Sequence, residues 1–408
     1  MCSKINVFSE IGKLNKVFLH RPGPELEGLI PNNLQRLLFD DIPYVKVAQQ
    51  EHDYFANILK ENGVEVLYAI EELEKAISNE KIRKQFVDEY LKESKIIDIS
   101  LKNTLSNYLM EKDTKGMINN IMSGIRKKEL CNKGISSLAE IMQDDNLFYV
   151  DPAPAEYFTR DPGACIGNGL SINVMSRRAR RRESLFLKYI YSYNKDFKDD
   201  SSKLWYEYEN TNSIEGGDIL VLSKNVVCIG CSERTSPEAI QKLAEKLLKW
   251  DNTFEKVLVF EIPKCRAFMH LDTVFTMVDY DKFTIHPEIE GPLNIYEIVM
   301  DKSFNLKFNN VSDSLENVLK KELKLDSVEL IRCGGGDELA APREQWNDGS
   351  NTLAIAPGTV ITYDRNYVTN ELLDKRGVKV LTMPSSELSR GRGGPRCMSM
   401  PIHRDNID

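Results

Sequence analysis

The sequence contains no stretch of about 18 apolar residues, the length that a transmembrane helix requires. Residues 1–23 mix polar, charged and apolar side chains, and they include no apolar core of a secretion signal. These two absences predict a protein without membrane segments that is located in the cytoplasm.

An excess of positive charge is also missing. The chain has 54 Lys and Arg residues against 62 Asp and Glu residues, which gives a formal net charge of −8. Binding to nucleic acid needs a basic surface. The one strongly basic run, Arg177–Arg182, is better interpreted in an acidic chain as a helix start with solvated arginines. We therefore expect no nucleic-acid partner.

Common metal-binding and redox motifs are absent. The sequence has no HExxH motif, and Cys228 and Cys231 form a single CxxC without a second cysteine pair or nearby histidines. The stretch Val226–Gly230 is typical of a strand, whereas redox CxxC motifs usually open a helix. The eight cysteines are scattered through the chain. We expect free thiols, no metal site and no cofactor.

The composition, with 41% hydrophobic and 28% charged residues, is typical of a globular protein. The sequence contains two kinds of segment, which differ in their pattern of apolar residues. From Val64 to Lys115 there is neither Gly nor Pro, and apolar residues recur at helical spacing. This pattern predicts a block of helices over Glu71–Met142. The remainder alternates short apolar runs, turns and single helices.

The segment between Ser213 and Pro263 illustrates this alternation of short apolar runs, turns and single helices. It predicts strands at Ile219–Leu222, Val226–Gly230 and Lys256–Ile262, with a helix that begins at Ser236-Pro237-Glu238. Similar β/α units occur near both ends of the chain. A recurring unit that cannot bury its apolar face alone indicates a closed repeat architecture, in which the block of helices is an insertion.

A glycine-rich loop near the C-terminus is the first candidate for chemistry. Three of the four residues from Gly391 to Gly394 are glycines, so the backbone can approach a ligand closely. The loop leads to Cys397, which follows Arg392 and Arg396. Nearby positive charge predicts a lowered thiol pKa and a reactive cysteine. The alternative interpretation is an incidental cysteine in a terminal loop.

A histidine and several carboxylates occur in three further motifs. His270 and Asp272 are two residues apart on a predicted strand, so their side chains leave the same face as a candidate acid/base pair. Glu215 and Asp218 flank two glycines, and Asp161 precedes a proline. The alternatives are a core histidine, a simple turn and a surface ion pair. Together, Cys, His and carboxylates predict covalent catalysis on a cationic guanidinium substrate.

Six strings in the sequence together resemble the arginine deiminases: LFDDIPY, FTRDP, EGGD, MHLDTVF, REQWNDGSNTLAIAPG and RGGPRCMSMP. The match extends from Phe8 to Pro401. The resemblance implies the pentein fold, an α/β five-bladed pseudo-symmetric propeller of ββαβ-type units with an inserted helical domain. The expected domains are a first unit at 1–70, the helical insertion at 71–148, and the remaining units at 149–408, which carry most of the active site.

The resemblance also implies an activity, the hydrolysis of free L-arginine to L-citrulline and ammonia in arginine catabolism, and a homo-oligomeric assembly of two or more chains. Cys397 matches the nucleophile that forms an amidino-thioether, and His270 matches the general acid and base. The matching carboxylates around the guanidinium are Asp161, Asp272 and Glu215. The matching substrate-binding residues are Arg180, Arg234, Arg396, Phe158 and Asp218, with Arg396 at the place of a mobile arginine.

One position departs from the family pattern. The family usually carries an asparagine that contacts the α-amino-acid end of the substrate, and this chain has Ala155 there. The loss affects the expected affinity, or the preferred substrate, more than the reaction class. Two alternatives follow: a related hydrolase or amidinotransferase with another guanidino substrate, or a non-catalytic arginine-binding protein. The complete set of Cys397, His270 and Glu215 favours the enzyme.

Overall fold

The computed structural model describes residues 4–130, 146–250, 254–291 and 293–407. Within these ranges, one strand pairing recurs in five groups of three strands: two antiparallel strands, and a third strand that runs parallel to the second. The groups are β19 (Met400–Arg404), β1 (Leu14–Leu19) and β2 (Glu65–Tyr68); β5 (Gly163–Ile166), β6 (Gly169–Ile172) and β7 (Lys203–Tyr206); β8 (Ile219–Val221), β9 (Val226–Cys231) and β10 (Lys256–Glu261); β11 (Phe275–Met277), β12 (Lys282–Ile285) and β15 (Glu329–Arg332); and β16 (Leu353–Ala356), β17 (Thr359–Tyr363) and β18 (Lys379–Met383).

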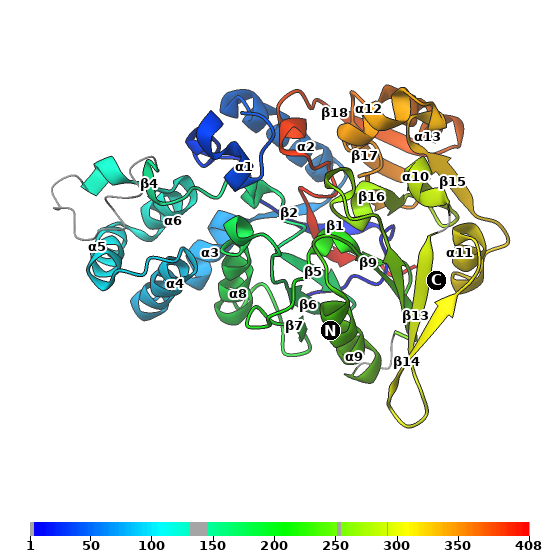
Figure 1. Cartoon of the computed structure of the whole chain (residues 1–408), viewed down its shortest axis with the longest axis horizontal. Helices are drawn as coiled ribbons and strands as arrows, with labels where there is room; N and C mark the ends of the chain where they lie inside the picture. The colour runs from blue at the N-terminus through cyan, green and yellow to red at the C-terminus, as the bar shows by residue number, and fades with distance from the viewer. Residues whose placement is uncertain (1–3, 131–145, 251–253, 292, 408) are drawn as a thin grey trace.

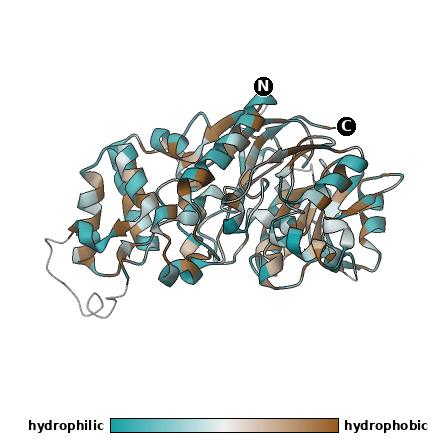
Figure 2. Cartoon of the chain, turned by 90° about the horizontal axis from the view of Figure 1, so that it is seen from above, coloured by the Kyte–Doolittle hydropathy of each residue, from teal (hydrophilic) through white to brown (hydrophobic). Residues whose placement is uncertain are grey.

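A helix precedes the third strand of each group, because two parallel strands need a crossover connection. These helices are α2 (Val45–Glu61), α8 (Glu183–Tyr193), α9 (Pro237–Trp250), α11 (Leu315–Glu322) and α13 (Tyr367–Lys375). α9 begins at Pro237, which the sequence places in the first turn of this helix. Hydrophilic and hydrophobic residues alternate along the helices (Figure 2), and the apolar residues Ile240, Leu243 and Leu247 of α9 are buried.

The first group takes its antiparallel strand from the far end of the chain. β19 pairs with β1, and the N–H of Asn6 also donates to the carbonyl of Ile402 at 2.9 Å. This strand, which begins three residues after Cys397, was not predicted from the sequence. The pairing fixes the nucleophile loop against the start of the chain.

A hairpin extends the β8–β10 sheet to five strands. It consists of β13 (Asn294–Met300) and β14 (Leu306–Val311), and β13 pairs with β10. The hairpin projects from the body of the molecule (Figure 1). Three shorter helices complete this part of the fold and the N-terminal region: α1 (Leu34–Leu37), α10 (Pro287–Glu290) and α12 (Ala340–Trp346).

The predicted block of helices forms one end of the molecule (Figure 1). It contains α3 (Ala69–Ala76), α4 (Glu80–Glu93), α5 (Ile99–Met110) and α6 (Thr114–Ser123), followed by the short pair of β3 (Ile125–Arg126) and β4 (Phe148–Val150). Asparagine or aspartate side chains cap α4, α5 and α6. Residues 131–145 of the predicted segment lie outside the described residues.

The helical block shares its core with the strand groups. Phe86 of α4 packs edge-to-face on Phe186 of α8, with ring centroids 5.7 Å apart, and both belong to one continuous cluster of buried apolar residues. The block is therefore anchored to the strand groups that carry the site. No helix among the described residues is long and apolar enough to cross a bilayer.

Candidate active site

The chemically active side chains lie just before the first strand of four groups. Asp161 precedes β5, Glu215 precedes β8, His270 and Asp272 precede β11, and Cys397 precedes β19. All five side chains are buried. Equivalent loops of the repeated groups therefore bring together residues that are far apart in the sequence.

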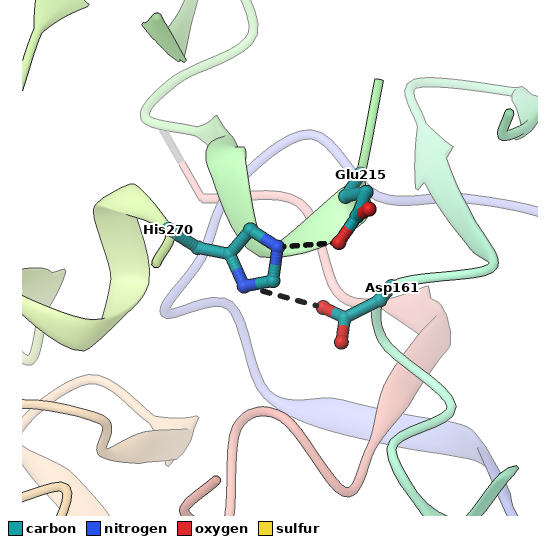
Figure 3. Close-up of side chains that lie close together, drawn as sticks. All are labelled: Asp161, Glu215 and His270. Atoms are coloured by element: carbon teal, nitrogen blue, oxygen red, sulfur yellow. Dashed lines mark hydrogen bonds and ion pairs between the residues drawn. The ribbon is translucent and has the colours of Figure 1, made fainter. Parts of the chain in front are cut away.

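The imidazole of His270 lies between two carboxylates (Figure 3). Its Nε2 is 2.7 Å from Oε2 of Glu215, and its Nδ1 is 3.8 Å from Oδ1 of Asp161. Burial alone would lower the pKa of His270, but the charge of Asp161 and the hydrogen bond to Glu215 outweigh it and raise the pKa to about 9. At neutral pH this histidine is an imidazolium that can donate a proton.

Glu215 is held as a carboxylate. Burial would raise its pKa, but His270 and the guanidinium of Arg234 outweigh burial and lower the pKa to about 2. Its other oxygen accepts the backbone N–H of Ser176 at 2.8 Å. The Glu215–His270 pair is thus a fixed ion pair rather than a neutral hydrogen bond.

The prediction that His270 and Asp272 lie on a strand is wrong. His270 has an extended backbone at φ −136° and ψ 163°, and Asp272 lies in the 3₁₀ turn η8 (Leu271–Thr273). The turn is fixed by Asp218, whose carboxylate accepts the N–H of Leu271 at 2.8 Å. Both side chains still reach the same site because the turn, and not strand alternation, directs them.

Asp218, which the sequence analysis assigns to substrate binding, has other partners in the structure. Its Oδ2 accepts the hydroxyl groups of Ser232 at 2.7 Å and Thr235 at 2.6 Å. Asp218 itself lies just before β8, and Ser232 and Thr235 lie just after β9. Through its further bond to Leu271, Asp218 connects these two loops to the His270 segment. The carboxylate organises the loops behind the pocket and does not line the pocket itself.

Cys397 lies at the entrance to β19, with its Sγ 3.7 Å from Oδ2 of Asp272. The prediction of a lowered thiol pKa is wrong. Burial, and then the charges of Asp272 and Asp161, raise the pKa of Cys397 well above its usual range, and the charge of Arg396 is too weak to reverse this. The resting side chain is therefore a thiol.

Arg396 does not occupy the place of a mobile arginine. Its side chain is 1% exposed, it pairs with Asp272 at 2.7 Å and Glu10 at 3.1 Å, and it also donates to the carbonyl of Ile219 at 2.8 Å. Arg392 lies in the pocket wall instead, with its guanidinium 3.5 Å from the ring centroid of Trp346. Both arginines precede Cys397 closely, and no sequence pattern distinguishes the one that faces the pocket from the one that is buried.

A small pocket opens above Cys397. Six predicted site residues line it: Phe158, Asp161, Arg180, Arg234, His270 and Cys397. Glu215, Asp272, Asp218 and Arg396 lie behind this lining. Five further lining residues were not predicted as substrate-binding residues: Leu38, Phe39, Met269, Thr273 and Arg392. All five belong to strings quoted above: Leu38 and Phe39 to LFDDIPY, Met269 and Thr273 to MHLDTVF, and Arg392 to RGGPRCMSMP. The first four carry neither a charge nor a nucleophile that would have marked them.

The glycines of the nucleophile loop are needed for close packing. A Cβ atom on Gly393 would lie 2.3 Å from the ring of Phe158, and one on Gly394 would lie 2.7 Å from the carbonyl oxygen of Asn351. Only glycine fits at both places. The loop is thereby pressed against Phe158, which walls the pocket.

Arg180 and Arg234 supply positive charge at the pocket. Arg180 donates to Asp161 at 2.6 Å and to Glu183 at 2.8 Å, and it also contacts the carbonyl oxygen of Ala155 at 3.4 Å. Arg234 lies 3.8 Å from Glu215, and its Nε is buried without a hydrogen-bond partner. Ala155 itself lines the pocket with a methyl group.

Among the described residues, Asp161, Glu215 and His270 have the spacing to hold a metal ion. A histidine binds a metal ion only as a neutral imidazole with a free lone pair. The two carboxylates stabilise the proton on His270, so a metal ion would have to displace that proton, whereas the trio as it stands can transfer the proton to a bound ligand.

Comparisons with known proteins agree on one family. The family model described as arginine deiminase matches residues 35–404. An arginine deiminase from Clostridium perfringens is 52% identical over 99% of this chain and 98% of its own, and one from Bacillus cytotoxicus is 53% identical over 99% of both chains.

Solved structures with little sequence similarity share the fold. An amidinotransferase of saxitoxin biosynthesis from Microseira wollei has a TM-score of 0.55 at 14% identity, covering 99% of this chain and 98% of its own. A dimethylarginine dimethylaminohydrolase from Pseudomonas aeruginosa, complexed with citrulline, has a TM-score of 0.53 at 14% identity, covering 95% of this chain and 99% of its own.

Proposed function

Because the chain belongs to the arginine deiminase family, we propose that it hydrolyses free L-arginine to L-citrulline and ammonia. The observation that carries this proposal is the pairing of a buried thiol with two carboxylate oxygens that accept no hydrogen bond, Oδ1 of Asp161 and Oδ1 of Asp272. A guanidinium presents N–H groups in a planar fork that suits two such acceptors. Asp161 lines the pocket and Asp272 lies behind it beside Cys397, so a guanidinium that reaches both carboxylates would have its central carbon close to Sγ of Cys397.

The first half of the reaction transfers the amidino group to sulfur. The cationic substrate lowers the thiol pKa as it binds, and the proton is released to solvent. Sγ of Cys397 then forms a bond to the guanidinium carbon. His270 donates its proton to the leaving nitrogen, the carbon–nitrogen bond breaks, and ammonia departs. Glu215 stabilises the imidazolium before the transfer, and such proton transfer contributes about 10²–10⁴-fold.

The second half hydrolyses the thioether. The neutral His270 accepts a proton from water, whose oxygen bonds to the amidino carbon. The carbon–sulfur bond then breaks as the hydroxyl proton of the intermediate passes to Sγ, citrulline leaves, and the thiol and the imidazolium are restored. Splitting one difficult displacement into two steps is the benefit of a covalent intermediate.

The outer pocket favours a substrate with a carboxylate. Arg234 has one buried nitrogen without a hydrogen-bond partner, and Arg392 has two. A guanidino compound without a carboxylate, such as agmatine, would leave these donors unpaired. Since Ala155 offers no side-chain hydrogen bond, the carboxylate and not the α-amino group would dominate recognition of this end.

The proposal extends to architecture and assembly. The recurring pairing of the five strand groups supports a five-bladed propeller with the site on its axis, and boundaries at 1–70, 71–148 and 149–408 remain our division of the chain. The homo-oligomer stays a prediction that sedimentation equilibrium can test.

The function is tested by incubating the purified protein with millimolar L-arginine, with and without a chelator. We expect equal amounts of citrulline and ammonia that the chelator does not change. Product that disappears with the chelator would contradict metal-free chemistry. No product from arginine would instead favour another guanidino substrate, or a binding protein, and would overturn the proposal.

The ionisation of His270 provides a prediction on pH. The unfolded-state pKa is about 6.5, and the folded-state pKa is about 9. Because the folded value is the higher one, the ion pair stabilises the protein fully below pH 6.5, and this contribution is lost as the pH rises through about 9. Glu215→Gln removes the charge partner, so we expect the pKa of His270 to fall in that variant.

Nuclear magnetic resonance titration of the imidazole groups measures this shift. The chain has five histidines, and a His270→Asn spectrum assigns the relevant signal. A pKa for His270 that is the same in wild-type protein and in Glu215→Gln would refute the ion pair.

A further inference from the structure

The fifth strand group also contributes a side chain to the site. Asn351 lies just before β16, the first strand of its group, which is the position that Asp161, Glu215 and Cys397 hold in theirs. We propose that Asn351 is a positioning residue, which sets the spacing between the nucleophile and the carboxylate of Asp272. The inference rests on the proposed function. It assigns a role to the strand group of β16, β17 and β18, which supplies no reacting atom.

The amide of Asn351 joins two segments of the site. Its Oδ1 accepts the backbone N–H of Cys397 at 3.0 Å, and its Nδ2 donates to the backbone carbonyl of Asp272 at 3.1 Å. The side chain is fully buried. One planar group therefore spans the residue that attacks the substrate and a residue that holds it.

The backbone around Asn351 is itself fixed. The carbonyl of Ser350 accepts the hydroxyl groups of Thr276 at 2.8 Å and Thr284 at 3.1 Å, which belong to β11 and β12. The hydroxyl group of Thr352 also contacts that of Thr276 at 2.8 Å. Asn351 is thus attached to the sheet of β11 and β12, which follows the turn that holds Asp272, and it positions Cys397 relative to that sheet.

The bond to Cys397 also suits the charge of the substrate. In acyl transfer, the backbone N–H groups beside a nucleophile stabilise a developing oxyanion. Here the N–H of Cys397 is occupied by Asn351. A guanidinium develops no oxyanion when sulfur attacks it, so the N–H is free to serve positioning. A misplacement of about 1 Å at a reacting group costs about 10²-fold in rate.

Two substitutions test the proposal. Asn351→Ala removes both hydrogen bonds, and we expect kcat for arginine to fall by about 10²-fold with a smaller change in KM. Asn351→Asp keeps the acceptor for Cys397 but brings a negative charge towards the thiol. We expect alkylation of Cys397 by iodoacetamide to require a higher pH in that variant than in wild-type protein.

Asn33 offers a matched control for the loss of two backbone contacts. It is a buried asparagine whose amide accepts the N–H of Ile30 at 2.9 Å and donates to the carbonyl of Gly28 at 2.9 Å. Neither contact involves the site. We expect kcat of Asn33→Ala to remain within about threefold of the wild-type value.

Three results would overturn the role of Asn351: a kcat of Asn351→Ala within about threefold of wild type, an equal loss in Asn33→Ala, or an unchanged alkylation profile in Asn351→Asp. The alkylation assay needs no arginine turnover. Wild-type protein that fails to produce citrulline would therefore refute the proposed function, while the alkylation profile would still decide whether Asn351 controls the thiol.

Discussion

Replacing Cys397 by alanine is expected to lower kcat for arginine by about 10⁴–10⁶-fold, the range seen when an enzyme loses its nucleophile. Without Sγ no thioether forms, and hydrolysis would depend on direct attack by water on a resonance-stabilised cation. The backbone N–H of Cys397, which binds Asn351, is retained in the variant. The loss is therefore chemical, and the fold should persist.

Citrulline formation and thermal unfolding with and without arginine measure the two parts of this prediction. Arginine should still raise the melting temperature of Cys397→Ala, since Asp161 and Asp272 remain. Cys333→Ala is the matched control, because Cys333 is a fully buried cysteine that does not line the pocket. Measurable turnover by Cys397→Ala beyond contaminating wild-type enzyme would contradict the assignment of the nucleophile.

Replacing Arg396 by methionine is expected to cost about 3–5 kcal/mol of unfolding free energy, the usual effect of removing one partner from a buried ion pair. In wild-type protein the guanidinium of Arg396 lies 2.7 Å from Asp272 and 3.1 Å from Glu10. The variant leaves both carboxylates buried without this cation. Charge on Asp272 would then be uncompensated beside Cys397, so turnover should fall as well.

Chemical denaturation provides the free energies, with Arg392→Met as the comparison. Arg392 stacks on Trp346 and lies 3.9 Å from Asp40. Because two of its buried nitrogens have no hydrogen-bond partner, its removal should cost only about 1 kcal/mol or less and should chiefly raise KM for arginine. Equal destabilisation by the two substitutions would show that Arg396 is not a structural ion-pair partner.

The contrast between these arginines shows what the sequence could predict. The types and order of Cys397, His270 and Glu215 point to covalent chemistry, because few arrangements need a thiol, an imidazole and carboxylates together. The direction in which a side chain points is harder to predict from the sequence. Arg392 has a left-handed backbone with φ of 63°, which the neighbouring glycines do not reveal, and its side chain enters the pocket while Arg396 turns to the core.

The other errors share one physical cause, which is tertiary packing. A sequence shows the arginines near Cys397, but the degree of burial decides the thiol pKa, and burial depends on the whole fold. Likewise, the spacing of His270 and Asp272 fits a strand as well as a turn. The turn is selected by Asp218, a residue over 50 positions away in the chain.

The pairing of β1 with β19 has a consequence for biosynthesis. On the ribosome, β1 emerges early, and its antiparallel partner can reach it only after nearly all the described residues have been translated. Until then β1 presents an unpaired edge, which invites association with other chains. Cys397 emerges in the same segment as β19, so the site of a nascent chain is incomplete until that segment has been translated.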